Sequence, residues 1–106
     1  MLSDNPFTLV DSSYNEAMPE GLLLYSGGTV CDDSFSDNSA IAICRKMGYT
    51  QAVSWRKFGY EWDIQDHLLI KLDDVDCSSG QWDSCDYWEG SNCNHGEDVY
   101  LQCECE

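Results

Sequence analysis

Apolar residues along the chain occur in short runs that are separated by glycine-rich and polar segments. A short apolar run bounded by Gly, Pro, Asn, Asp or Ser is typical of a β-strand. Between two such runs, Ser26-Gly27-Gly28 indicates a tight turn that joins two strands. The pattern therefore predicts strands at Phe7–Val10, Leu22–Tyr25, Thr29–Cys31, Leu68–Leu72 and Val99–Cys103.

One segment has the apolar period of an α-helix. Residues 36–38 (Ser-Asp-Asn) are three successive N-cap candidates, and Gly48 is suited to end the helix. The predicted apolar face carries Ala40, Ile43, Cys44 and Met47. Cys44 should therefore point into the core, where it can meet a partner cysteine.

Two long segments follow neither period. Gln51–Asp66 mixes aromatic and charged residues, and we expect a loop there with at most one short strand. Ser78–Gly96 is rich in Gly, Ser, Asn and Trp, which favours a loop. The sum is a small α+β fold with several short strands, one main helix and long loops.

Cysteine usage adds crosslinks to this picture. The chain of 106 residues has the usual length of one domain and holds seven cysteines, at positions 31, 44, 77, 85, 93, 103 and 105. This density is rare in reducing compartments, and no Cys-x-x-Cys motif points to a thioredoxin-like or zinc site. We expect a disulfide-stapled domain that is secreted or forms the extracellular part of a membrane protein.

The charge balance is strongly acidic. Twenty Asp and Glu residues against five Lys and Arg residues give a net charge of −15. This charge repels phosphate backbones and anionic membrane surfaces, so nucleic acid is not expected as a partner. No run approaches 18 apolar residues, so membrane insertion is not expected either. The acids either form a solvated surface or are grouped to hold a hard cation such as Ca²⁺.

Four stretches of the sequence, taken in order, are similar to one known family: GTVCDDSF at 28–35, AIAICRKMGY at 40–49, LDDVDC at 72–77 and NCNHGED at 92–98. They resemble the scavenger receptor cysteine-rich (SRCR) family, six-cysteine group A, over residues 7–103. Residues 1–6 are then an N-terminal extension and residues 104–106 a C-terminal tail. The resemblance implies short antiparallel strands curved around the main helix, and an extracellular recognition module rather than an enzyme.

The resemblance also implies a disulfide pattern, namely Cys31–Cys93, Cys44–Cys103 and Cys77–Cys85. Six cysteines allow many pairings, and the sequence alone does not choose among them. Cys105 is left over. It is either a free thiol near the terminus or the source of an intermolecular disulfide, which would give a linked dimer.

The implied Cys31–Cys93 disulfide brings Asp32 and Asp33 close to Glu97, because bridged α-carbons lie about 5–6 Å apart. Converging carboxylates repel one another unless a cation binds, and Ca²⁺ (or Mg²⁺) takes oxygen ligands. Family members bind a cation with residues that match these three, so we expect a first calcium site there. The alternative is that Asp32 or Asp33 caps the following helix or turn.

The resemblance implies a second cation site at Asp73 and Asn92, to which Asp74 or Asp76 could add a ligand. One or two calcium ions are therefore expected. The alternative is that Asp73 and Asp74 only turn the chain at the end of a strand. A zinc site at His95 with Cys93 and Cys103 is a further interpretation, and it fails if those cysteines are oxidised.

Aromatic residues gather in the two segments that are expected to be loops. They are either partly buried core or, where several are exposed, a recognition patch, because Trp and Tyr anchor many interfaces. The candidates for a ligand patch are Trp55, Arg56, Tyr60, Trp62 and Trp88.

No G-x-S-x-G, H-E-x-x-H or P-loop motif occurs, so catalysis is not expected. The first function to consider is calcium-dependent recognition of an extracellular protein or of a glycan or microbial polyanion. The second is an acidic, calcium-binding secreted or matrix protein that assembles with itself. The third is a non-catalytic module of a larger secreted enzyme or receptor.

Overall fold

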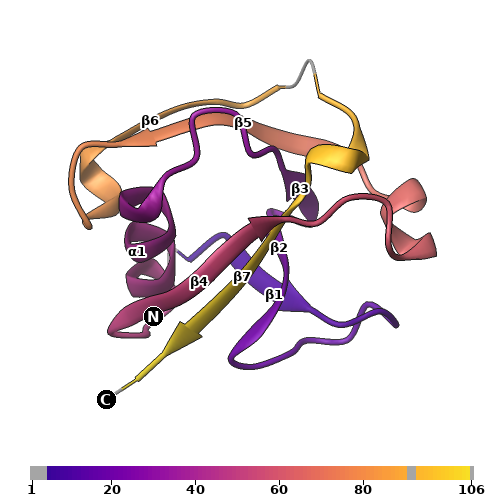
Figure 1. The fold of residues 1–106 in the computed structure, drawn as a ribbon, viewed down its shortest axis with the longest axis horizontal. Coiled ribbons are helices and arrows are strands. Elements are labelled where there is room, and N and C mark those ends of the chain that lie inside the picture. The colour runs from indigo at the N-terminus through magenta and orange to yellow at the C-terminus, as the bar shows by residue number, and fades with distance from the viewer. Residues whose placement is uncertain (1–4, 91–92, 106) are drawn as a thin grey trace.

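The computed structural model describes residues 5–90 and 93–105. Seven strands within these residues form one sheet in the order β4-β7-β2-β3-β5-β6, with β1 paired to β2 (Figure 1). The strands are β1 (Phe7–Val10), β2 (Glu20–Tyr25), β3 (Gly28–Val30), β4 (Gln51–Lys57), β5 (Ile70–Cys77), β6 (Cys85–Trp88) and β7 (Val99–Glu104). The sheet is curled, and α1 (Asp37–Lys46) packs against β4 and β5.

One strand pair departs from the expected antiparallel arrangement. β3 runs parallel to β5, with Thr29 opposite Ile70 and Val30 opposite Leu72. A parallel pair needs a long crossover, which the 39 residues from 31 to 69 provide here. The sheet is therefore mixed.

The helix forms where the apolar period predicts it. Ser36 is the N-cap, and its side chain and that of Ser39 form a reciprocal capping box. Gly48 follows the last turn with φ +101°, a conformation that glycine adopts without strain. The helix buries Ala40, Ile43 and Cys44 in the main core.

The sheet carries apolar clusters on both faces. Leu23 of β2 belongs to the main core under α1, whereas Leu22 and Leu24 belong to a second cluster with Phe58. The continuous apolar run of β2 is explained by this burial on both faces.

Three disulfides tie these layers together. They join Cys31 to Cys93, Cys44 to Cys103 and Cys77 to Cys85, the pairs that the family resemblance implies. Cys105 is a free, exposed cysteine. In the described ranges, no helix is long and apolar enough to cross a membrane.

Both segments expected to be loops contain a strand. β4 is an edge strand with much exposed surface, so no apolar alternation marks it, and β7 sets its position through pairing. β6 is a short acidic and aromatic strand that pairs with β5. β5 itself begins two residues later than predicted and continues to Cys77 through the acidic residues, with an irregularity between Asp73 and Asp76.

Candidate cation-binding cluster

Backbone pairing brings three acidic segments together. The parallel β3–β5 pair places the residues that follow β3 beside the middle of β5, and the Cys31 amide donates to the carbonyl of Leu72 at 2.8 Å. The Cys31–Cys93 disulfide and the 2.9 Å hydrogen bond from the Asp32 amide to the Glu97 carbonyl add the short helix η3 (His95–Glu97). Acids far apart in the sequence therefore lie close together on one face of the molecule.

The carboxylates form two overlapping groups that share Asp33. The first group consists of one carboxylate oxygen each from Asp33 and Glu97 and the sulfurs of Cys31 and Cys93. These four atoms all lie within 4.8 Å of one another. In the second, Asp33, Asp73 and Asp74 offer oxygens that all lie within 4.8 Å of one another. The sulfurs belong to a disulfide and are not thiolate ligands, so oxygen is the donor in both groups.

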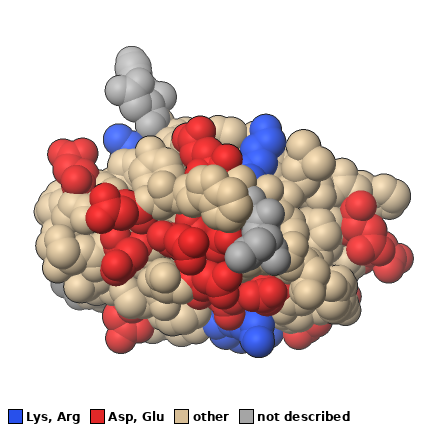
Figure 2. All heavy atoms as spheres, turned by 90° about the horizontal axis from the view of Figure 1, so that it is seen from above, with Lys and Arg blue, Asp and Glu red and all other residues tan. Residues whose placement is uncertain are grey.

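The residues of these groups differ in exposure. Asp73 is fully buried and accepts a 2.7 Å hydrogen bond from the Asp74 amide, while Asp74 is exposed with φ +55°. Asp33 and Glu97 are half-buried. Figure 2, which views the molecule from the side of β5 and β6, shows acidic side chains gathered across the middle of this face.

Two aspartates at this face have raised pKa values. Partial loss of solvent contact raises the pKa of Asp33, and so do the negative charges of Asp73, Glu97 and Asp74. The pKa of Asp32 is also raised, chiefly by desolvation, although the nearby charge of Lys57 opposes the shift. A bound cation would relieve this repulsion.

The two predicted ligand sets are not separate in the structure, because residues of both contribute to the groups around Asp33. Asp33 and Glu97 of the first set lie together, and Asp73 of the second set joins Asp33. Asp32 is outside both groups, although it is next to Asp33. Asp76 is exposed on β5, and Asn92 lies outside the described residues.

A buried polar network includes His95 of η3, and no local signal in the sequence indicated it. Asp98 is fully buried, and its Oδ2 atom lies 2.9 Å from both Gln65 Nε2 and His95 Nδ1. His95 Nε2 lies 2.9 Å from the Leu68 carbonyl, so His95 is a structural residue, and the zinc interpretation is wrong because Cys93 and Cys103 form disulfides. Burial raises the pKa of Asp98 despite its hydrogen bonds.

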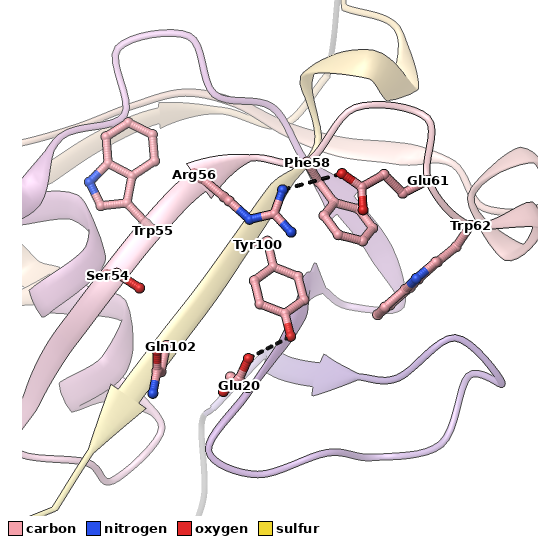
Figure 3. A pocket seen from close by; sticks show the side chains of 9 residues that line it. All are labelled: Glu20, Ser54, Trp55, Arg56, Phe58, Glu61, Trp62, Tyr100 and Gln102. Atoms are coloured by element: carbon pink, nitrogen blue, oxygen red, sulfur yellow. Dashed lines mark hydrogen bonds and ion pairs between the residues drawn. The ribbon is translucent and has the colours of Figure 1, made fainter.

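Three of the five candidates for an aromatic ligand patch line the same cavity. They are Trp55, Arg56 and Trp62 (Figure 3). Tyr60 is 67% exposed in the loop after β4, and Trp88 is 50% exposed on β6. Neither of these two lines the cavity.

Comparison with known sequences identifies relatives. The family model of the scavenger receptor cysteine-rich domain matches residues 19–104. Lysyl oxidase homolog 2 of Xenopus laevis is 38% identical over 99 residues, which cover 85% of this chain and 12% of that protein. Macrophage receptor MARCO of Mesocricetus auratus is 36% identical over 81 residues, covering 72% of this chain and 15% of that protein. The chain thus spans a small part of the length of these relatives.

Solved structures share the fold. The third SRCR domain of murine neurotrypsin aligns with a TM-score of 0.60 and 27% identity, over 95% of this chain and 97% of that one. The dimeric form of the SRCR domain of mouse MARCO aligns with a TM-score of 0.56 and 30% identity, over 73% and 74%. The family match, the shared fold and the three disulfides show that this chain is an extracellular domain of the scavenger receptor cysteine-rich family.

Proposed function

We propose that the domain is a calcium-dependent recognition module whose cation site is built on Asp33. The observation that carries this proposal is that Asp33 belongs to both carboxylate groups, one with Glu97 and the other with Asp73 and Asp74. Four carboxylates at one face, with a raised Asp33 pKa, form a site that gains from a divalent cation. Calcium suits it best, because Ca²⁺ takes many oxygen ligands in flexible geometry, whereas Mg²⁺ needs a near-ideal octahedron.

In this proposal a bound calcium ion completes a recognition surface for an extracellular protein or for a glycan or microbial polyanion. Two calcium ions would change the net charge from −15 to −11, which leaves the domain strongly acidic. The remaining negative charge favours protein ligands with basic surfaces over polyanions.

Calorimetric titration of Ca²⁺ into the oxidised chain tests the cation site. Asp33→Asn keeps the side-chain shape and removes the carboxylate shared by both groups, so it should abolish binding in the millimolar range typical of extracellular modules. Asp66→Asn removes the same charge from an exposed residue outside the cluster and should leave binding unchanged. Absence of binding to the parent chain up to several millimolar Ca²⁺ would refute the proposal.

Asp32→Asn separates the two ligand arrangements. Asp32 lies outside both groups, so this variant should lose less affinity than Asp33→Asn. An equal loss would show that Asp32 turns toward the ion when it binds, as the family resemblance implies.

A second candidate function is that of a binding module within a larger protein. The relatives named above are several times longer than this chain, and two of them are a lysyl oxidase homolog and a receptor. We propose that the chain serves as a non-catalytic binding module of such a secreted enzyme or receptor. A native transcript that encodes further domains supports this, and one that encodes this domain alone contradicts it.

Self-assembly is the third candidate, and Cys105 favours it. This cysteine is exposed and free, and a related SRCR domain has been solved as a dimer. Sedimentation of the oxidised chain with and without Ca²⁺, beside Cys105→Ser, tests this candidate. A monomer under all conditions at high micromolar concentration would exclude it.

A further inference from the structure

A cavity of about 390 Å³ lies on the sheet face opposite α1 (Figure 3), and no carboxylate of the cation-binding cluster lines it. Cross-strand pairing forms its floor. Arg56 of β4 is opposite Tyr100 of β7, and in the next row Gln102 of β7 lies between Ser54 and Glu20. Side chains at these positions point to one face because they are two residues apart along each strand.

Aromatic rings make up the apolar wall of this cavity. Phe58 stacks on Tyr100 with ring centroids 5.1 Å apart, and Trp62 meets Phe58 edge to face at 4.7 Å. The Arg56 guanidinium lies 5.0 Å from the centroids of both Phe58 and Tyr100. The wall therefore already holds one flat cation against its ring faces.

Two carboxylates flank these rings. Glu61 Oε2 lies 3.3 Å from Arg56, in an ion pair whose side chains are 53% and 51% exposed. Glu20 Oε2 accepts a 2.8 Å hydrogen bond from the Tyr100 hydroxyl. The cavity thus has two negative groups and one positive group, in a chain of net charge −15, which disfavours an anionic ligand.

We propose that this cavity binds the side chain of an arginine or lysine on a protein partner, and that Arg56 occupies the same place in the unbound domain. The incoming cation would take the ring faces of Phe58 and Tyr100 and the carboxylate of Glu61, with Glu20 at the opposite side. Displacing Arg56 is easy because exposed ion pairs contribute little. The site requires no metal ion, so it is independent of the calcium proposal.

Titrations followed by nuclear magnetic resonance test this inference. N-acetyl-arginine methylamide and N-acetyl-lysine methylamide are added to the oxidised chain in EDTA, and the indole N–H signal of Trp62 is followed. Both probes should shift this signal with saturation at a dissociation constant on the order of millimolar. N-acetyl-citrulline methylamide, the neutral isostere of the arginine probe, should shift it little.

Variants of opposite charge should act in opposite directions. Glu61→Gln should weaken binding of the arginine probe by about threefold, while Glu16→Gln, an equal change outside the cavity, should change it by less than about 1.5-fold. Arg56→Gln should tighten binding by about threefold because it removes the internal competitor. Lys46→Gln, which removes a positive charge on α1, should leave the affinity for the arginine probe unchanged.

Three results would overturn the inference. The citrulline probe could bind as tightly as the arginine probe, which would show that the cavity does not select for positive charge. Glu61→Gln could weaken binding no more than Glu16→Gln, which would mean that overall charge attracts the probe. Arg56→Gln could weaken binding, which would make Arg56 part of the site rather than its occupant. Because EDTA is present throughout, none of these results depends on whether calcium binds.

Discussion

Removing the Cys44–Cys103 disulfide should destabilise the domain more than removing Cys77–Cys85. The first bridge joins α1 to β7 through two cysteines that are fully buried in the main core. The second closes the β5–β6 hairpin over a sequence separation of only 8 residues, and Cys85 is half-buried. The variants are Cys44→Ala/Cys103→Ala and Cys77→Ala/Cys85→Ala, both with Cys105→Ser to prevent thiol exchange.

The magnitudes follow from the loops that each bridge closes in the unfolded chain. Because Cys31–Cys93 remains, the shortest loop through Cys44–Cys103 contains about 25 residues rather than about 60, and closing it contributes about 3.5 kcal/mol. Burial of the two sulfurs adds about 1 kcal/mol. Closing the Cys77–Cys85 loop of about nine residues contributes about 2.6 kcal/mol.

Urea unfolding in EDTA, followed by tryptophan fluorescence and far-UV circular dichroism, measures both values. The Cys44/Cys103 variant should lose about 4.5 kcal/mol, which approaches the whole stability of a small domain. The Cys77/Cys85 variant should keep a cooperative transition. Equal losses, or a larger loss for the Cys77/Cys85 variant, would refute the argument from loop length and burial.

Three further predictions concern the acids, the core and the helix. The pKa values of Asp32 and Asp33 are raised, so these groups bind protons more tightly in the folded state than in the unfolded state. Their protonation should therefore raise the melting temperature in EDTA as the pH falls from 7 toward their ordinary pKa of 3.8. Calcium affinity should fall over the same range, and a pH-independent affinity would contradict the carboxylate site. Leu101→Ala should cost about 3 kcal/mol in urea unfolding, because this side chain is fully buried in the main core, and a loss below about 1 kcal/mol would show that the core closes around the gap. Ser36→Ala should cost about 1 kcal/mol by removing the N-cap, whereas Ser36→Thr should restore most of it, and equal stability of the two variants would show that the cap is not used.

Local signals in the sequence predicted the elements that have a buried face. The apolar period of the helix, its N-cap and its glycine end agree with α1, because a helix is specified by residues within a few positions of one another. β1, β2 and β7 were predicted for a similar reason, since their apolar residues pack into the two clusters. β6 was missed, and the one short strand expected within residues 51–66 could not be placed, because β4 and β6 lie at the two edges of the sheet, where exposed side chains do not follow the period of two.

The sequence by itself determined the compartment, the family and the chemical character of the chain, which is a disulfide-stapled and strongly acidic domain. Only the tertiary structure decided which carboxylates meet. The parallel pairing of β3 with β5 sets Asp73 beside Asp33 across 40 positions of sequence, and no local signal encodes that register. The cavity beside Arg56 is likewise built from β2, β4, β7 and the loop after β4. Contacts of this kind depend on long-range strand pairing, and the residues involved show no periodicity that would reveal it.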